Sequence, residues 1–257
     1  MHTLSRAAED YLKAIYMLTF SGEHVTTGVL AHELGVSSPS VSAMAKRLRT
    51  EHLLERLEGR VLRLTDRGEH AALRVIRRHR LLETFLAMAL ALPWDEVHAE
   101  AELLEHALSD RLEDRIDAAL GHPTRDPHGD PIPPRDGHHD EAWGDPLDAA
   151  PAGCRFRVDR VSDRDSAALR YLGALRIVPG VVLDVAEQAP FGGPRWVRVR
   201  GQRHALGGPL TRLVHGQVLP VAPGTQSRDD AASTVTARRG IGKDRSGDIS
   251  SGPEVSR

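Results

Sequence analysis

Residues 27–50 read TGVLAHELGVSSPSVSAMAKRLRT, and this stretch predicts two short helices joined by a tight turn. Gly35 can end the first helix and Ser37 can cap the second. Pro39 lies in the first turn of the second helix, where its missing N–H costs nothing. A helix, a short glycine turn and another helix form the helix-turn-helix motif.

The flanking residues extend this motif to a winged helix-turn-helix unit. Residues 5–20 carry apolar side chains at helical spacing and predict a preceding amphipathic helix. Two short strands, Leu54–Leu57 and Val61–Leu64, are predicted around a turn at 58–60, and Thr65 can cap the next helix.

The composition predicts a soluble globular protein with enough apolar residues for more than one core. The chain has 257 residues, of which 40% are hydrophobic, so two small domains with linkers are expected. The longest apolar run, 85–94, is too short to cross a bilayer, and residues 1–10 lack a signal pattern, so a cytoplasmic protein is expected. The single cysteine, Cys154, cannot form an intrachain disulfide or a cysteine-rich zinc site, so any metal must be bound by histidines and carboxylates.

Charge is distributed unevenly along the chain, although the net charge is only −2. Residues 40–80 contain 11 Lys and Arg and 5 Asp and Glu, which gives +6, whereas residues 95–117 contain 2 and 9, which gives −7. The basic block suits a polyanion and the acidic block suits a cation, and the alternative is that both are solvated helix faces.

Two long helices are predicted beyond the winged unit, at 66–92 and 94–120, and Pro93 separates them. Residues 121–151 contain 7 Pro, 4 Gly and 6 Asp and form either a linker or an extended segment lying on a surface.

The C-terminal half changes to a β-rich pattern. Residues 154–221 contain short β-patterns separated by Gly and Pro, so a small barrel is expected, with one helix at 165–172. The tail after Pro223 has few large apolar residues and is predicted to be disordered.

One helical face collects side chains that can bind a metal. Residues 97–106 read VHAEAELLEH, and at about 100° per residue two histidines and two glutamates fall within one sector of about 100°. His79 and Glu83 stand at i, i+4 in the preceding helix, so they share a face, and Asp10 offers a further carboxylate. The alternative is an acidic surface that pairs with Arg111 and Arg115.

Several motifs resemble the iron- and manganese-dependent repressor family, relatives of the diphtheria toxin repressor and the manganese transport regulator. The resemblance covers residues 3–220 and rests on AAEDYLKAIY, SSPSVSAMAKRL, LTDRG, RRHRLLETFL, LPWDEVHAEAELLEH and GHPTRDPHGDPIP. It implies a mainly α protein with a small β domain. The implied segments are a winged helix-turn-helix DNA-binding domain at 1–73, a helical metal-binding and dimerisation domain at 74–120, a proline-rich linker at 121–151, an SH3-like (FeoA-like) β-barrel at 152–222 and a disordered tail at 223–257.

The resemblance also implies a function, namely a metal-dependent transcriptional repressor that controls metal homeostasis genes and is not an enzyme. The implied partners are double-stranded DNA with a palindromic operator and a second copy of the chain, with no membrane and no small-molecule substrate. Two alternatives remain open from the residues alone. One is a metallohydrolase fused to a DNA-binding module, although the sequence contains no HExxH motif. The other is a metal-independent regulator whose acidic and histidine residues form only a salt-bridge face.

The ligands are implied by position in the family. The primary site consists of Asp10, Glu102, Glu105 and His106, and the ancillary site consists of His79, Glu83 and His98, with Asp163 and Asp165 as substitutes for its barrel ligands. Iron-type members have methionine at the position of Asp10 and cysteine at that of Glu102. Oxygen ligands with imidazole and no sulfur favour Mn²⁺, with Fe²⁺ as the alternative and with Co²⁺ or Zn²⁺ as substitutes in vitro. Lys13 departs from the manganese regulators, which have glutamate there, so the resemblance does not imply the second metal site of that subtype.

The DNA-binding positions are likewise implied by the resemblance, and the alternative is a winged helix used for protein contacts. They are Thr27, Ser37, Pro39, Ser40, Ser42, Lys46, Arg47 and Arg60. Ala43 departs from the glutamine of iron-type members, so base readout is expected to use apolar contacts to thymine methyl groups and DNA shape. The stretch DPHGDPIPP resembles a proline-rich segment that can occupy the SH3-like domain, and a plain linker is the alternative.

Overall fold

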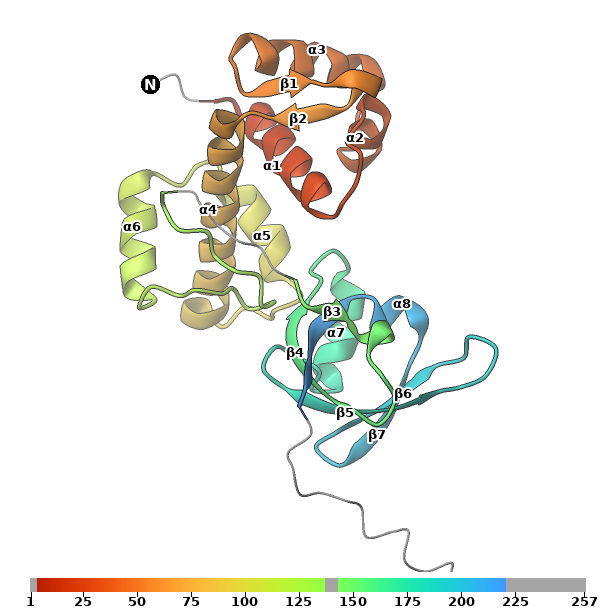
Figure 1. The fold of residues 1–257 in the computed structure, drawn as a ribbon. Coiled ribbons are helices and arrows are strands. Elements are labelled where there is room, and N and C mark those ends of the chain that lie inside the picture. The colour runs from red at the N-terminus through yellow and green to blue at the C-terminus, as the bar shows by residue number, and fades with distance from the viewer. Residues whose placement is uncertain (1–3, 137–142, 221–257) are drawn as a thin grey trace, which may run out of the picture. The chain divides into compact units, whose positions relative to one another are not determined.

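The computed structural model describes residues 4–136 and 143–220, and its first part is a winged helix-turn-helix unit (Figure 1). Its elements are α1 (Arg6–Phe20), α2 (Thr27–Glu33), α3 (Ser38–Thr50), β1 (Leu54–Arg56), the short 3₁₀ turn η1 (Glu58–Arg60) and β2 (Leu62–Leu64). The two strands pair antiparallel, with Leu54 opposite Leu64. The predicted helices and the predicted wing are therefore present.

Side-chain caps start each helix of the winged unit. Ser5, Thr26 and Ser37 accept hydrogen bonds from backbone N–H groups in the first turns of α1, α2 and α3. Such caps satisfy donors that have no partner inside the helix. The three helices bury a shared core that includes Leu12, Ile15, Leu30, Val41 and Leu48.

The next unit consists of three helices, α4 (Asp66–Leu90), α5 (Val97–Leu104) and α6 (Asp110–Ala119). The predicted single helix at 94–120 is wrong, because Glu105–Ser109 separates α5 from α6. The Ser109 side chain accepts a hydrogen bond from Leu112 N and starts α6 as a new helix. A short polar residue followed by acidic residues is an N-terminal signal, which the apolar periodicity concealed.

The basic and acidic blocks of the sequence partly neutralise each other within this unit. Arg77 contacts Glu113 at 3.0 Å and Asp117 at 2.9 Å, and Arg78 contacts Glu113 at 3.1 Å and Asp110 at 2.6 Å. These ion pairs join α4 to α6 and are largely buried on the arginine side. Part of the uneven charge along the sequence therefore serves to hold α4 against α6.

The C-terminal unit is a six-stranded antiparallel sheet with strand order β3-β8-β4-β5-β6-β7. Its elements are β3 (Asp145–Pro146), the 3₁₀ turn η2 (Leu147–Ala149), β4 (Arg155–Val161), α7 (Ser166–Ala174), β5 (Val182–Gln188), β6 (Arg195–Val199), β7 (Gln202–Leu206), α8 (Gly208–Thr211) and β8 (Val214–Leu219). The sheet curves around α7 (Figure 1). Phe156, Leu169, Leu172 and Leu183 are fully buried in its core. The sequence pattern missed β3 and β7.

The proline-rich stretch 124–133 is a tight loop held against α4, and it folds back on itself so that Arg125 pairs with Pro131 in an isolated antiparallel bridge. Arg77 Nη1 donates to Pro133 O at 2.9 Å, and Ile132 is buried in the core of the helical unit. The same stretch also meets the sheet unit, because Val161 N donates to His128 O at 2.9 Å. Residues 124–133 are packed against the folded units rather than forming a free linker, but they form a turned loop and not the extended segment that was the second interpretation of 121–151.

No helix among the described residues is long and apolar enough to cross a membrane. The tail at 223–257, which the sequence predicts to be disordered, lies outside the described residues.

Candidate metal centre

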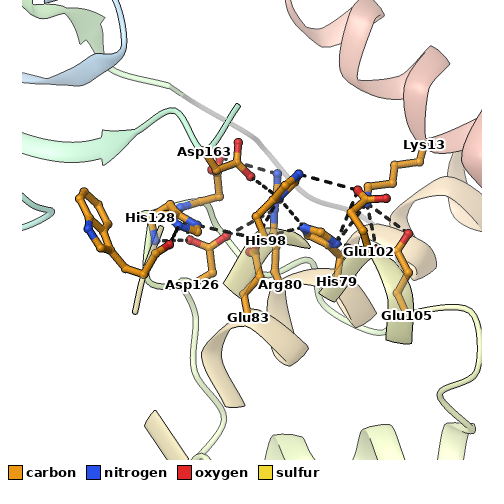
Figure 2. A network of polar contacts seen from close by, with 12 residues as sticks. Lys13, His79, Arg80, Glu83, His98, Glu102, Glu105, Asp126, His128 and Asp163 are labelled. Atoms are coloured by element: carbon orange, nitrogen blue, oxygen red, sulfur yellow. Dashed lines mark hydrogen bonds and ion pairs between the residues drawn. The ribbon is translucent and has the colours of Figure 1, made fainter. Parts of the chain in front are cut away.

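A continuous series of histidines, carboxylates and one lysine connects α1 with α4, α5 and the loop at 124–133 (Figure 2). The series contains several groups of three or four side chains whose ligand atoms lie within 4.8 Å of one another.

The primary cluster consists of Asp10, Glu105 and His106. His106 Nε2 lies 2.8 Å from Asp10 Oδ1 and 3.4 Å from Glu105 Oε1, while His106 Nδ1 lies 2.6 Å from Glu9 Oε2. The Nε2 atom is buried and makes no aligned hydrogen bond despite the short approach to Asp10. Burial raises the pKa of the Asp10 carboxyl, His106 opposes this shift, and Glu105 adds to it. The cluster therefore combines a carboxylate pair with an imidazole nitrogen that is available to a cation.

The ancillary cluster consists of His79, Glu83, His98 and Asp163. Glu83 Oε1 lies 3.0 Å from His79 Nε2 and 3.1 Å from His98 Nδ1, which in turn lies 3.0 Å from Asp163 Oδ2. Burial would lower the pKa of His98, but the hydrogen bonds to Asp163 and Glu83 raise it to about 10. Burial would raise the pKa of Asp163, but its hydrogen bond to His98 outweighs this effect and the pKa falls below its usual range.

Behind the ancillary cluster lies a fully buried cluster of Glu83, Asp126 and His128, which sequence reasoning missed. His128 Nε2 lies 2.7 Å from the carbonyl oxygen of Trp94, to which it can donate, and His128 Nδ1 lies 3.8 Å from Glu83 Oε1. Glu83 Oε2 and His128 Nδ1 are buried without a hydrogen-bond partner. Burial would lower the pKa of His128, but Glu83 raises it to about 9. A histidine between two aspartates in a proline-rich stretch was the available signal.

The central cluster consists of His79, Glu102 and Glu105, and it links the primary cluster to the ancillary cluster. Lys13 Nζ lies among these three side chains and contacts each of them. His79 Nδ1 lies 2.5 Å from Glu105 Oε2. Lys13 was singled out in the sequence only as a departure, and its position among the acidic ligands could not be read from spacing.

The donor atoms of the primary and ancillary clusters fit a divalent metal ion. They are carboxylate oxygens and imidazole nitrogens, a set that suits Mn²⁺, Fe²⁺ and similar ions. Buried polar atoms normally have partners, so the unsatisfied Glu83 Oε2 and the unaligned His106 Nε2 mark positions where a cation would complete the contacts.

The structure places most of the expected ligands together and separates two of them. Asp163 joins the ancillary cluster, whereas Asp165 does not, because its Oδ1 accepts from the N–H groups of residues 167 and 168 and caps α7. The expectation for Asp165 is therefore wrong. Glu102 is 41% exposed on its side chain and contacts Lys13 at 2.6 Å rather than joining the primary cluster. The prediction that all four side chains of 97–106 lie on one helix is also wrong, because α5 ends at Leu104 and both Glu105 and His106 follow it.

The expected DNA-binding residues line the exposed side of α3 and the wing. Val41, Ala45 and Leu48 face the core of the winged unit. The expected contacts Ser37, Pro39, Ser40, Ser42, Lys46 and Arg47 are exposed on α3 or at its start. Thr27 is half-buried at the start of α2, and Arg60 is exposed in the wing.

Comparison with known proteins places three family models along the chain. The iron dependent repressor N-terminal DNA binding domain matches residues 3–58, the iron dependent repressor metal binding and dimerisation domain matches 65–134, and the FeoA domain matches 146–216. A solved manganese-dependent transcriptional repressor in complex with manganese is 42% identical, and the chain covers all of it. The chain belongs to the iron- and manganese-dependent repressor family. Members of this family are DNA-binding repressors rather than enzymes.

Both manganese-dependent and iron-dependent proteins are similar to this chain. The manganese repressor structure has a TM-score of 0.77 and covers 82% of this chain, and the manganese regulator SloR has a TM-score of 0.69 at 31% identity, with 82% of this chain and 98% of SloR covered. The iron-dependent repressor IdeR of Mycobacterium tuberculosis is 40% identical over 133 residues, and the diphtheria toxin repressor of Corynebacterium diphtheriae is 35% identical over 133 residues. These alignments cover 52% of this chain, and they span only 58% and 59% of the two relatives.

Proposed function

We propose that this chain is a metal-activated transcriptional repressor that binds a palindromic operator as a homodimer and controls genes of metal homeostasis. The observation that carries the proposal is the primary cluster, in which Asp10 of the winged unit meets Glu105 and His106 of the helical unit. An ion shared between the two units would fix the orientation of the recognition helix. Because the ion would stabilise one arrangement of the two units more than others, it would change DNA affinity without catalysis.

The proposed primary ligands are Asp10, Glu105 and His106, with Glu102 able to join once its carboxylate leaves Lys13. The proposed ancillary ligands are His79, Glu83, His98 and Asp163. His128 is a further candidate, because donating Nε2–H to a backbone carbonyl leaves Nδ1 free for a metal. The bound ion would supply only charge and a bonding geometry.

Manganese is the proposed corepressor. The ligands in both clusters are oxygens and imidazole nitrogens, which lack the sulfur that favours later transition ions. Solved structures of manganese repressors support this choice. Iron is the alternative, because iron-dependent relatives are also similar to this chain.

The proposed DNA-binding surface is the exposed side of α3, with Arg60 of the wing as a phosphate contact. A recognition helix of this kind presents its N-terminal residues to base edges in the major groove, while basic side chains meet phosphates. Ser42 and the preceding exposed residues on α3 face outward for such contacts, and Lys46 and Arg47 lie one turn further on.

An apolar groove on the helical unit supports dimerisation. Its lining residues include Leu82, Phe85, Leu86, Leu90, Leu104, Leu108, Leu112 and Ile116. Leu90, Leu104 and Leu112 are 56%, 43% and 51% exposed in the single chain. Contiguous apolar surface on this scale usually marks an interaction site, so we assign it to a second copy of the chain.

The domain boundaries are part of the proposal. The segments are 1–73 for DNA binding, 74–120 for metal binding and dimerisation, 121–151 as a connection, and 152–222 for the FeoA-like domain. We add that residues 124–133 would move with the helical unit, because Ile132 is packed in the core of that unit.

The test is DNA binding as a function of metal. An operator is selected from a random DNA library in MnCl₂, and its affinity is measured by fluorescence anisotropy with Mn²⁺, Fe²⁺, Co²⁺, Zn²⁺ or a chelator. The wild type should bind only with a divalent ion, and Asp10→Asn should need a higher Mn²⁺ concentration. Glu100→Gln, an exposed change on α5, is the control. Equal binding with metal and with chelator would overturn the proposal.

A further inference from the structure

The ammonium group of Lys13 lies inside a group of side chains that has the composition of a metal site. Its Nζ donates to Glu102 Oε1 at 2.6 Å and to Glu105 Oε2 at 2.9 Å, and it lies 3.1 Å from His79 Nδ1. Figure 2 shows the lysine reaching these side chains from α1, which belongs to the winged unit, whereas the other residues belong to the helical unit. The central cluster is thus already in contact with a positive charge that belongs to the chain.

The ammonium group matches the central cluster in number of bonds and in charge. A lysine ammonium is a compact charge with three donors, and three carboxylate oxygens accept from it here, namely Glu102 Oε1, Glu105 Oε1 and Glu105 Oε2. The side chain is 16% exposed and that of Glu105 is fully buried. The ammonium group of Lys13 therefore lies between the carboxylates of Glu102 and Glu105 in a site that is largely shielded from water.

We propose that Lys13 is the resident cation of the central cluster, that it excludes a third divalent ion, and that it competes with metal for Glu102 and Glu105. A divalent ion on the same three side chains would lie next to the ammonium, where repulsion is strong because the site is partly shielded from water. The proposal rests on the proposed function, because it takes the primary and ancillary clusters as the metal sites.

Competition follows from shared side chains. Glu105 belongs to both the primary and the central cluster, and His79 belongs to both the central and the ancillary cluster. An ion that binds Glu105 in the primary cluster therefore weakens the contacts of Lys13. A cleft of about 420 Å³, lined in part by Lys13, Arg6 and Asp10, gives the released ammonium room to reach water. Lys13 thereby raises the metal concentration needed for occupancy.

Three substitutions of Lys13 in the full chain separate its charge from its size. Lys13→Glu replaces the cation with a further carboxylate, Lys13→Gln removes the charge, and Lys13→Arg keeps it as the matched control. Bound Mn²⁺ is counted by elemental analysis after equilibrium dialysis, and half-saturation is measured against a competing chelator. Circular dichroism verifies that each variant is folded.

We expect two Mn²⁺ ions per chain for the wild type and for Lys13→Arg, and three for Lys13→Glu. The Mn²⁺ concentration at half-saturation should be lower in Lys13→Gln than in the wild type, on the order of tenfold, because the metal no longer competes with a partly buried ion pair. Two ions in both the wild type and Lys13→Glu, with unchanged half-saturation, would overturn the role of Lys13 and leave the proposed function standing. A wild type that binds no Mn²⁺ would overturn both.

A measurement on the wild type covers the case in which the variants do not fold. The chain has three lysines, Lys13, Lys46 and Lys243, so ¹⁵N-lysine labelling gives few ammonium signals. In metal-free protein the Lys13 signal should be protected from exchange, and diamagnetic Zn²⁺ should remove that protection. A Lys13 signal that exchanges as fast as that of Lys46 before Zn²⁺ is added would overturn the proposal.

Discussion

His98 Nδ1 of α5 lies 3.0 Å from Oδ2 of Asp163, a residue of the short connection between β4 and α7. The contact joins the helical unit to the sheet unit within a cluster that also contains Glu83. The sheet unit therefore contributes a carboxylate to the ancillary cluster. If that cluster holds metal, its occupancy is coupled to the position of the sheet unit.

Substituting Asp163 tests this coupling directly. Asp163→Asn removes a charged oxygen ligand and keeps the shape of the side chain, so ancillary metal affinity should fall about 10- to 100-fold. Calorimetric titration with Mn²⁺ should show one weakened site and one unchanged site. Asp184→Asn, an exposed change on β5, is the control and should leave both sites unchanged. Two unchanged sites in Asp163→Asn would remove this residue from the metal centre.

The pKa of His98 predicts how the metal-free protein responds to pH. Folding raises this pKa from its ordinary 6.5 to about 10. The contribution of protonated His98 to the free energy of unfolding is complete below pH 6.5 and is lost as pH rises toward 10. Between these values the folded state still holds a proton that the unfolded state has released, so raising the pH favours unfolding. Thermal unfolding in chelator should therefore show a Tm that falls across this window.

The histidine responsible can be identified by substitution. His98→Asn should flatten the fall in Tm, and His70→Asn, which changes an exposed histidine on α4, should leave it as in the wild type. The same slope in His98→Asn and wild type would assign the pH dependence to another group, with His128 the next candidate because its pKa is raised to about 9.

Arg47 provides a prediction for the DNA-binding surface. Its Nε lies 2.9 Å from Glu51 Oε1, and its side chain is 53% exposed, so it can leave this contact for a phosphate. Arg47→Ala should weaken binding to all DNA sequences, and the slope of log affinity against log salt should become shallower by about 1. Arg198→Ala, an exposed change on β6, is the control. An unchanged slope in a salt series would place Arg47 away from the DNA.

The sequence predicted the elements whose signals are local. Ser37 and Pro39 define the start of α3, and the structure has the cap that they predict. The i, i+4 spacing of His79 and Glu83 also survives, because both lie on one uninterrupted helix. Local caps and helical spacing are sufficient for such features, since they depend on neighbours in the chain.

Features that depend on distant contacts could not be predicted. His128 reaches Glu83 only because residues 124–133 fold back onto α4, which no periodicity encodes. Glu102 was expected beside His106 from the family pattern, but Lys13 of another helix attracts its carboxylate. Asp165 had the right residue type, but it serves α7 as a cap.

The last prediction concerns metal choice, which we assign to Asp10 and Glu102. Asp10 Oδ1 lies 2.8 Å from His106 Nε2, and Glu102 lies near the primary cluster while in contact with Lys13. Replacing these carboxylates with a thioether and a thiolate should favour softer and later transition ions. The double variant Asp10→Met with Glu102→Cys should therefore shift activation of DNA binding from Mn²⁺ toward Fe²⁺ or Co²⁺.

The informative quantity is the ratio of half-activating concentrations for Mn²⁺ and Co²⁺, measured anaerobically on one operator. The double variant loses one negative charge, because the thiolate at residue 102 keeps its own, and this loss weakens the binding of every divalent ion. Release of Lys13 from Glu102 likewise changes the competition for every ion, so neither effect alters the ratio. We expect the Mn²⁺-to-Co²⁺ ratio to rise on the order of tenfold, equivalent to about 1.4 kcal/mol. Glu100→Cys places a thiol on the exposed side of α5 and should keep the wild-type ratio. If the double variant also keeps it, Asp10 and Glu102 do not determine metal selectivity, and the argument for manganese from these two residues is lost.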